Sequence, residues 1–449
     1  MNRFNLFLKK LNSYADLPCM DSGDRTFSYG DLLKEFATWQ GRLEQLNIQP
    51  GSVVGLRADY SLASTAALLA LFARGSVAAL IPRDRDPAPY LQDGGANGLL
   101  EVHNDGTYQW QALLVSGAQH ELLERLRTSG DAGVVIFTSG STGKPKAALQ
   151  SLERFLYKFQ GQGRRFRTLG FLLFDHVAGL DTLFYTLSSG GVLVVTRKRD
   201  PAAICALIHR ARVEVLPASP SFLRLLCLAG SAGDYDLSSL KVITYGSEPM
   251  DPATLMRLNE RFPQLQISQK YGTTETGSPR SESRGKDSLW LKLKNDGVET
   301  RVVDNVLWIR SEGTILGYLN APSPVDAEGW YCTGDLVDVD GEWIKFRGRV
   351  SDVINVGGEK VAPSEVEQVI LSVDNVQEAV VSGERHALMG QIVTARVALV
   401  EGADSKQAAK AIRARCRERL APYKVPVKIE FVPGGLINDR QKAQRMIGS

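Results

Sequence analysis

The sequence predicts an α/β protein: a large N-terminal domain of mostly parallel sheets flanked by helices, followed by a small α+β C-terminal domain. Its 449 residues exceed what one hydrophobic core usually serves, so at least two domains are expected. Helix-like and strand-like segments alternate along most of the chain, which is typical of parallel sheets with helices on their faces. Around Gly329 the alternation gives way to charged hairpins, and we place the domains at 1–348 and 349–449.

The elements of the N-terminal domain are expected in a βα order. The longest apolar stretch, Leu62–Ile81, is interrupted by Arg74 and Gly75, so it is predicted to be a buried helix and a strand and not a membrane span. Other short β-branched runs predict strands. The expected helices are Tyr29–Leu46, Ala63–Ala73 and Pro201–Ala211, and the expected strands are 52–56, 133–137, 191–195, 213–216 and 265–269.

The N-terminal domain is expected to end in a hairpin, and a mixed set of helices and strands is expected after the boundary. Leu336–Phe346 is rich in charged residues and contains Asp340-Gly341, a strong hairpin turn signal. After the boundary the pattern predicts a further set of elements. These are a helix beginning at Pro363, strands at Ala379–Val381 and Ile392–Val400, and a basic helix at Asp404–Leu420.

The composition is that of a soluble globular protein. Hydrophobic residues make up 43% and charged residues 23% of the chain. A net charge of only +3 argues against nucleic acid as the main partner. The five cysteines are scattered without CxxC spacing, and residues 1–10 lack the apolar core of a signal peptide. We therefore expect a cytoplasmic protein that does not associate with membranes.

Residues Thr138–Lys146 are rich in groups that bind phosphate. They read TSGSTGKPK and follow the predicted strand 133–137. Hydroxyls, glycine-freed backbone N–H groups and two lysines suit a polyanion such as the phosphates of ATP. A Walker loop needs glycine and a hydroxyl residue where this chain has Thr138 and Pro145. The segment therefore predicts a phosphate-binding loop of another kind, with a polar surface loop as the alternative.

This nonapeptide resembles the signature loop of the adenylate-forming superfamily, which includes acyl-CoA synthetases, adenylation domains of peptide synthetases and luciferases. The resemblance extends from about Thr26 to Arg445. It implies that the loop holds the β- and γ-phosphates of ATP. The residues assigned to this role are Thr138, Ser139, Gly140, Ser141, Thr142, Gly143, Lys144 and Lys146.

Segment Tyr271–Gly277 reads YGTTETG and is similar to a second signature of that superfamily, Tyr-Gly-x-Thr-Glu. An aromatic ring can stack on a purine, hydroxyls can bind phosphate oxygens, and a carboxylate can hold Mg²⁺. By itself the segment is equally consistent with a plain turn. The resemblance implies nucleotide contacts from Tyr271, Gly272 and Thr273, and catalytic roles for Thr274 and the metal ligand Glu275.

Two further segments resemble the family's nucleoside site. Tyr245-Gly246-Ser247-Glu248, at the end of a predicted strand, is similar to the adenine-binding segment, although an ordinary βα loop would look the same. Asp335, in WYCTGD, can accept hydrogen bonds from both ribose hydroxyls. The resemblance makes Asp335 the ribose ligand, assisted by Arg349, and the alternative is a turn carboxylate.

The C-terminal segments imply a mobile domain. Gly357, Gly358 and Glu359 look like the family's loop that enters the active site only in the thioester-forming state. The family's hinge residue is commonly Asp or Lys, whereas this chain has Ser351. A small residue can still act as a hinge.

Lys442 falls where the family has its catalytic lysine. The usual pattern ends Gly-Lys-x-x-Arg, and here it reads QKAQR, without the glycine. The alternatives are a solvated basic tail, or Lys146 or Lys424 in the catalytic role.

Segment 174–181, FDHVAGLD, should form the carboxylate pocket. His176 resembles the histidine that gates the acyl site in acyl- and aryl-CoA ligases, although a lone histidine can be purely structural. Asp175 leaves an ambiguity, because adenylation domains for amino acids use such an aspartate to bind the α-ammonium. The expected substrate-binding residues are Asp175, His176, Gly179, Tyr245, Gly272 and Gly277.

The resemblance as a whole implies an AMP-forming acid–thiol ligase of the acyl-CoA synthetase type. It would use ATP, Mg²⁺ and coenzyme A to convert a small-molecule carboxylic acid to an acyl-adenylate, releasing pyrophosphate, and then to a thioester. One alternative is a stand-alone adenylation enzyme that loads an amino or aryl acid onto carrier-protein phosphopantetheine. The other is a non-catalytic nucleotide-binding homologue, suggested by Ser351 and the missing glycine before Lys442.

Overall fold

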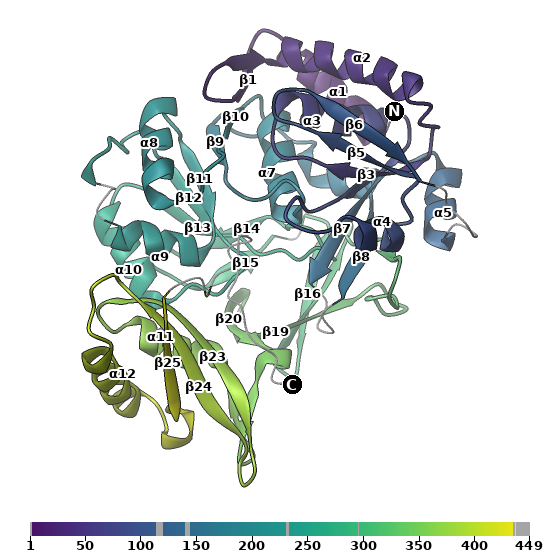
Figure 1. Ribbon diagram of the computed structural model, residues 1–449. Coiled ribbons are helices and arrows are strands. Elements are labelled where there is room, and N and C mark those ends of the chain that lie inside the picture. Colours follow the sequence, from purple (N-terminus) through teal and green to yellow (C-terminus); the bar gives the residue numbers. More distant parts are fainter. Residues whose placement is uncertain are drawn as a thin grey trace.

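The structure is a computed structural model that describes residues 2–113, 120–139, 144–229, 233–294, 296–433 and 436. Within these residues the strands form four sheets (Figure 1). None of the described helices is long and apolar enough to cross a membrane. The helices are α1 (Arg3–Asn12), α2 (Tyr29–Gln45), α3 (Leu62–Ala73), α4 (Ala88–Asp93), α5 (Glu121–Ser129), α6 (Leu152–Phe155), α7 (Val177–Ser188), α8 (Pro201–Ala211), α9 (Pro220–Leu228), α10 (Pro252–Arg261), α11 (Pro363–Leu371) and α12 (Ser405–Arg419).

The first sheet, called here the N-terminal sheet, has the strand order β18-β8-β7-β4-β3-β5-β6. Its central strands β7, β4, β3 and β5 are parallel, and antiparallel strands close both edges. The strands are β3 (Val53–Arg57), β4 (Val77–Leu80), β5 (Gly98–Val102), β6 (Tyr108–Ala112), β7 (Gly133–Ser139), β8 (Pro145–Ser151) and β18 (Gly317–Tyr318).

The second sheet, called the cavity sheet, has the order β13-β12-β11-β9-β10-β1-β2. It is parallel except for the edge pair β1–β2. The strands are β1 (Pro18–Asp21), β2 (Thr26–Ser28), β9 (Arg167–Gly170), β10 (Val192–Val195), β11 (Val215–Ala218), β12 (Val242–Tyr245) and β13 (Gln266–Gln269).

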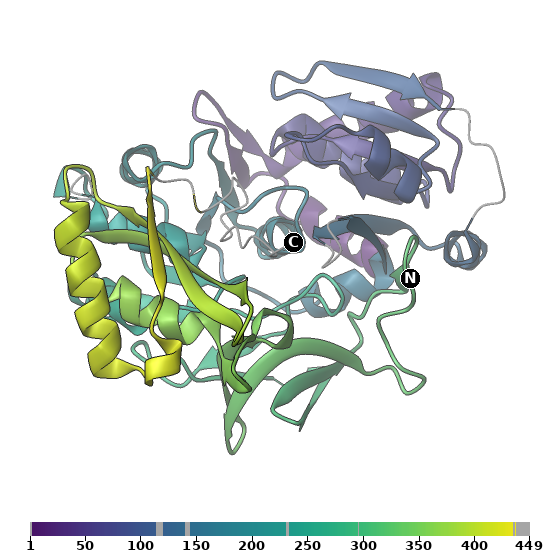
Figure 2. The same cartoon turned by 60° about the horizontal axis from the view of Figure 1, so that its bottom comes forward.

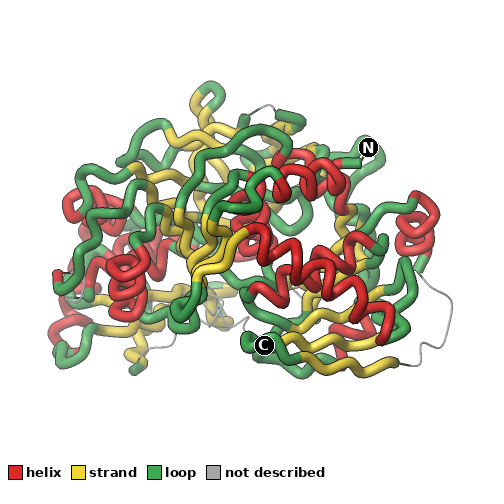
Figure 3. The backbone as a smooth tube through the Cα atoms, turned by 90° about the horizontal axis from the view of Figure 1, so that it is seen from above, coloured by secondary structure: helices red, strands yellow, loops and turns green. Residues whose placement is uncertain are grey.

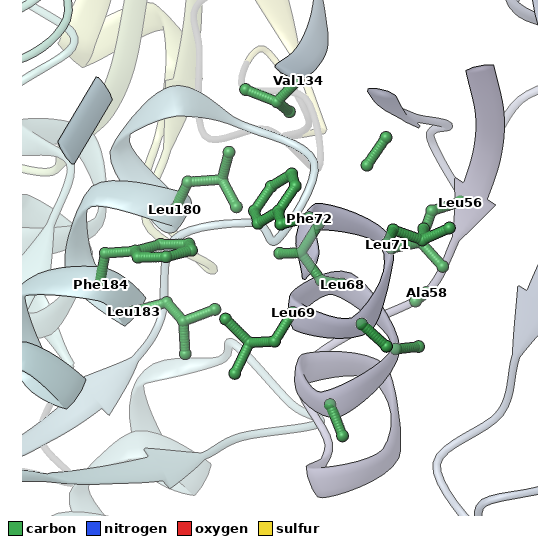
Figure 4. Packing of buried hydrophobic residues seen from close by; sticks show 14 of the residues in the cluster. Leu56, Ala58, Leu68, Leu69, Leu71, Phe72, Val134, Leu180, Leu183 and Phe184 are labelled. Carbon is green, nitrogen blue, oxygen red and sulfur yellow. The ribbon is translucent and has the colours of Figure 1, made fainter. Parts of the chain in front are cut away.

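Helices α3 and α7 lie between these two sheets. Every residue of α3 from Ala63 to Phe72 is buried, because the helix packs against strands on one side and another helix on the other. Figure 4 shows Leu68, Leu69 and Phe72 of α3 facing Leu180, Leu183 and Phe184 of α7. The helix–strand layering is also visible from above in Figure 3. A shared core thus fixes α7, which forms one wall of the site described below.

The remaining two sheets follow in the chain. The antiparallel sheet has the order β14-β15-β20-β19-β17-β16, and the C-terminal sheet has the order β22-β21-β24-β23, with β25 beside β24. Helices α11 and α12 lie beside the C-terminal sheet (Figure 2). Their side chains Val366, Ile370, Ile412 and Cys416 belong to the same core cluster as residues of that sheet. The strands are β14 (Ser281–Ser283), β15 (Leu291–Leu293), β16 (Val298–Val303), β17 (Val306–Ser311), β19 (Tyr331–Asp340), β20 (Trp343–Arg349), β21 (Ile354–Val356), β22 (Glu359–Val361), β23 (Val376–His386), β24 (Gly390–Leu399) and β25 (Lys428–Val432).

The predicted α/β class, with a small α+β unit at the C-terminus, is confirmed. One expected strand, 213–216, begins later, at Val215, because Arg212 ends α8 in a left-handed conformation (φ 49°) and the N–H of Val213 still donates to the carbonyl of Ile208. The expected strand Ala379–Val381 is only the middle of β23, which pairs along its length with β24.

Candidate active site

A cavity of about 1190 Å³ opens at one face of the cavity sheet. Adjacent strands β11, β12 and β13 are in parallel register, so Val215 lies beside Val242 and Gln266. Two residues further on, Pro217, Thr244 and Ser268 form the next row. Side chains two apart on a strand point to the same face, and all six residues line the cavity.

Helix α7 forms a second wall of this cavity. Ala178, Asp181, Thr182 and Tyr185 line it, with the spacing of three and four residues that places side chains on one helix face. Asp181 forms an ion pair with Lys158, whose ammonium group also donates a 2.7 Å hydrogen bond to the carbonyl of Ser278.

The end of the cavity that is expected to bind the nucleoside is built around Asp335. Its carboxylate accepts hydrogen bonds from the Tyr271 hydroxyl at 2.7 Å and from Nε of Arg349 at 2.9 Å. Tyr271 and Arg349 line the cavity, and Asp335 lies directly behind them, only 8% exposed. Burial raises the pKa of Asp335, and the charge of Arg349 opposes that rise. The Tyr271 ring stacks on Phe346 at 4.5 Å and 11°, so one of its faces is already covered.

Glu275 is a buried carboxylate at the cavity wall. It is 7% exposed, and its Oε1 accepts a 2.5 Å hydrogen bond from the hydroxyl of Tyr318. Burial and the charge of Glu275 raise the pKa of Tyr318. The ammonium group of Lys146 lies 5.1 Å from the centre of the Tyr318 ring. Tyr318 therefore fixes the orientation of Glu275.

Glu275 is the carboxylate expected to hold Mg²⁺. The described residues contain no cluster of three His, Cys, Asp or Glu side chains that could enclose a metal ion. Mg²⁺ is usually bound through one or two carboxylates together with substrate phosphates and water. Glu275, which lines the cavity beside Thr274, fits that mode of binding.

The predicted phosphate loop joins strands β7 and β8. These strands are antiparallel, with Thr138 opposite Lys146 and Ser139 opposite Pro145. A hairpin, and not the strand–helix unit of a P-loop, therefore carries the loop. Thr138 lines the cavity, whereas Lys144 is exposed and neither lysine is part of the lining. Residues Gly140, Ser141, Thr142 and Gly143 and the side chain of Ser139 lie outside the described residues.

In the predicted adenine segment, Tyr245, Gly246 and Ser247 line the cavity. A Cβ at Gly246 would lie 2.7 Å from the carbonyl oxygen of Lys270, so glycine permits this close approach. Glu248 is not part of the lining, and its Oε2 accepts a 2.5 Å hydrogen bond from Ser221.

In the predicted nucleotide and acid segments, Gly272, Thr273 and His176 also line the cavity, and His176 is the N-cap residue of α7. Asp175 is not among the lining residues. Its charge acts on the hydroxyl of Tyr60, whose pKa is raised mainly by burial. Gly179 is also absent from the lining. A Cβ at this position would lie 1.8 Å from the Leu173 carbonyl oxygen, so close packing requires glycine here.

Four further candidates lie elsewhere. Gly277 pairs with Thr273 in an isolated bridge with φ 69°, away from the cavity lining. Gly357, Gly358 and Glu359 form the exposed β21–β22 turn, and the two glycines have φ of 61° and 94°. None of these residues contributes to the cavity lining in the described part of the chain.

Lys442 lies outside the described residues. The chain leading toward it is anchored on the C-terminal sheet at Leu436. This residue is 1% exposed, packs with Val380 and Ala398, and its N–H donates a 2.8 Å hydrogen bond to Glu378. The competing Lys424 forms 2.7 Å bonds to both carboxylate oxygens of Glu365 and does not line the cavity.

The sequence interpretation missed Lys158 and Lys270, which both line the cavity. Lys270 had a detectable signal. It directly precedes Tyr271 and continues the alternation of Gln266 and Ser268 on the cavity face of β13. No local pattern identifies Lys158, because its partner Asp181 belongs to another element.

The comparisons with known proteins agree with this geometry. The model of the AMP-binding enzyme family matches residues 85–319, and that of the AMP-binding enzyme C-terminal domain matches residues 365–438. A 2-succinylbenzoate–CoA ligase of Geobacillus kaustophilus is 28% identical over 95% of this chain and 93% of its own length.

Solved structures share the fold. The anthranilate CoA ligase AuaEII in complex with anthranoyl-AMP has a TM-score of 0.84 at 21% identity, covering 99% of this chain and 95% of that one. The amide bond synthetase McbA from Marinactinospora thermotolerans has a TM-score of 0.80 at 21% identity, covering 98% of both chains. The chain belongs to the AMP-binding enzyme family, within the adenylate-forming superfamily, and is of the acyl- or aryl-CoA ligase type.

Proposed function

We propose that this protein joins a carboxylic acid to the thiol of coenzyme A in two steps. The first step forms an acyl-adenylate and releases pyrophosphate, and the second forms the thioester and releases AMP. The observation that carries the proposal is the continuity of one cavity. The nucleoside group of Tyr271, Asp335 and Arg349 borders the same space that α7 and the cavity sheet line, so a nucleotide and an acid can meet there.

In the first step a carboxylate oxygen attacks the α-phosphorus of ATP, and the bond to the pyrophosphate oxygen breaks. Asp335 would hold the ribose hydroxyls, while Thr138 and its loop would hold the outer phosphates. Glu275 would hold Mg²⁺, which when bound neutralises phosphate charge. Lys442 would stabilise the negative charge that develops during the transfer.

In the second step the thiol attacks the acyl carbon, and AMP leaves. We propose that residues 349–449 act as a lid that turns about Ser351, withdrawing Lys442 and presenting the Gly357–Glu359 turn. Ser351 lies in the exposed 3-10 helix Val350–Asp352, which immediately follows the last strand of the antiparallel sheet. A short exposed connection of this kind supports a hinge.

A carrier-protein phosphopantetheine is the alternative acceptor. This alternative depends on Asp175 binding the α-ammonium group of an amino acid substrate. The position of Asp175 outside the cavity lining favours the CoA ligase. The described cysteines are all free thiols, which supports the cytoplasm as the site of action.

ATP–pyrophosphate exchange over a broad panel of carboxylic acids tests the first step. The best acid is then incubated with ATP and either CoA or a phosphopantetheinylated carrier protein. Exchange followed by CoA thioester formation is the expected result. If exchange occurs but the acyl group is transferred only to the carrier protein, the carrier and not CoA is the acceptor. ATP binding without exchange would indicate a non-catalytic homologue.

A further inference from the structure

The acyl end of the cavity, defined here as the part bounded by α7, residues 158–164 and strand β13, has walls of mixed polarity. Its walls combine apolar residues such as Phe159 and Leu172 with many hydroxyl groups and charges. Thr182 and Ser268 already have hydrogen-bond partners in the protein, but an apolar acyl chain would remove water from the charged groups of this wall, which is costly. The hydroxyl-bearing residues include Thr168, Thr182, Thr244, Ser268 and Ser278.

Lys270 projects into this end. It follows the last residue of β13, and its side chain is exposed to the cavity. The charges that act on it come from Asp181, Lys158, Lys294 and Arg280, which all line the same region. Its neighbour Tyr271 instead reaches Asp335 at the nucleoside end. Lys270 therefore faces the acid and not the ribose.

Three other basic side chains near Lys270 already have acidic partners. Lys158 pairs with Asp181. Arg280 lies 3.2 Å from Asp296, and Lys294 lies 3.2 Å from Glu282.

Lys270 forms no side-chain hydrogen bond or ion pair with any residue that the structure describes. Burial in the surrounding protein removes water from the ammonium group and lowers the pKa of Lys270, and the negative charge of Asp181 opposes this decrease. An anion bound beside it would supply the missing partner.

We propose that the acid substrate carries a second anionic group, a carboxylate remote from the one that is activated, and that Lys270 binds it. This inference rests on the proposed function and adds the class of the acid: a dicarboxylic acid. It excludes long-chain fatty acids as the preferred substrates. A carboxylate beside Lys270 gains a charge-assisted hydrogen bond from its ammonium group, whereas a terminal methyl group gains nothing comparable.

The test is ATP–pyrophosphate exchange without CoA, using acids in matched pairs. Glutaric, adipic and terephthalic acids are compared with pentanoic, hexanoic and para-toluic acids. We expect the wild-type protein to prefer the diacids. Lys270→Met should raise KM for a diacid about tenfold or more, because a hydrogen bond between charged groups is lost, and should leave KM for its monoacid partner nearly unchanged. Lys270→Arg should retain most of the preference.

Lys292→Met is the matched control. Lys292 is a lysine on β15 that lies 2.5 Å from Glu342 and does not line the cavity. Two results would overturn the inference and leave the proposed function standing. One is exchange by the wild-type protein with no preference for diacids, and the other is an equal rise in KM for diacid and monoacid in Lys270→Met. Exchange with no acid of either kind, by a folded protein that binds ATP, would overturn the proposed function itself.

Discussion

Arg224 on helix α9 donates a 2.7 Å hydrogen bond to the carbonyl oxygen of Val376, the first residue of β23 in the C-terminal sheet. The same guanidinium group donates to the carbonyls of Leu371, at 2.7 Å, and Gln377, at 3.1 Å. Leu371 ends α11, where helix carbonyls lack intrahelical partners and carry partial negative charge. Arg224 is only 3% exposed, so one buried cation connects the N-terminal part to the C-terminal sheet.

Replacement of Arg224 by Met should loosen this connection. The carbonyls of Leu371 and Val376 would lose their donor, and Asp251, which lies 3.6 Å from the guanidinium group, would lose its counter-charge. Removing one partner of a buried ion pair costs about 3–5 kcal/mol. We expect faster hydrogen exchange in α11 and β23, measured by mass spectrometry, with α3 unchanged. Arg212→Met, at an exposed pair with Asp236, is the control, and equal exchange in both variants would contradict the role of Arg224.

The local elements were predictable because their signals are local. Helix α2 begins where Ser28 and Asp31 form a reciprocal capping box, and α3 is buried because its sequence is apolar on every side. The motifs also identified Tyr271, Asp335 and Arg349. The hydrogen bond from Tyr271 to Asp335, 64 residues away, depends on how the antiparallel sheet meets β13, and no local pattern encodes it. The same holds for the pairing of Lys158 with Asp181 and for the Arg224 contacts.

Glu275→Gln should slow pyrophosphate exchange strongly and raise the Mg²⁺ concentration that the reaction requires. The amide keeps the shape of the side chain but loses the charge that holds a cation. Tyr318→Phe removes only the hydroxyl bonded to Glu275, so its effect should be smaller. Exchange rates are measured across a Mg²⁺ titration for both variants. An unchanged Mg²⁺ requirement in Glu275→Gln would rule out Glu275 as the metal ligand.

Asp335→Asn should raise KM for ATP by roughly ten- to a hundredfold, since hydrogen bonds to a charged acceptor are lost. Burial raises the pKa of Asp335 above the ordinary 3.8, so ATP affinity of the wild-type protein should decline as the pH falls toward that raised value. Isothermal titration with ATP at decreasing pH measures this. Asp338→Asn, at an exposed position paired with Arg347, is the control. Equal ATP affinity in Asp335→Asn and wild type would exclude the ribose contact.

Lys442→Ala should abolish adenylate formation, while a supplied acyl-adenylate is still converted to the CoA thioester. The lysine is proposed to act only on the phosphate transfer, so the two half-reactions should separate. Lys424→Ala is the matched control, because Lys424 is held by Glu365 outside the cavity lining. The two half-reactions are measured by pyrophosphate release and by thioester formation. Equal loss of both in Lys442→Ala would remove Lys442 from the catalytic role.

The pH dependence of diacid use should report the state of Lys270. Burial lowers the pKa of this lysine below its ordinary value of 10.5, while Asp181 opposes and Lys158, Lys294 and Arg280 reinforce the decrease. Only the ammonium form binds an anion, so kcat/KM for a diacid should be highest below the lowered pKa and should fall as the pH rises through it. Because kcat/KM reports groups of the free enzyme, Lys270→Met should lack this alkaline decline.

The monoacid of each pair provides the internal control for that profile. It makes no ion pair with Lys270, so its kcat/KM should show no decline in the same pH range in either protein. If kcat/KM declines for both acids and still declines in Lys270→Met, the titrating group is not Lys270. It would then be another group needed for adenylate formation, such as Lys442. A decline confined to the diacid and lost in Lys270→Met ties the remote carboxylate to the ammonium group of Lys270, because a neutral lysine offers an anion no charge to pair with.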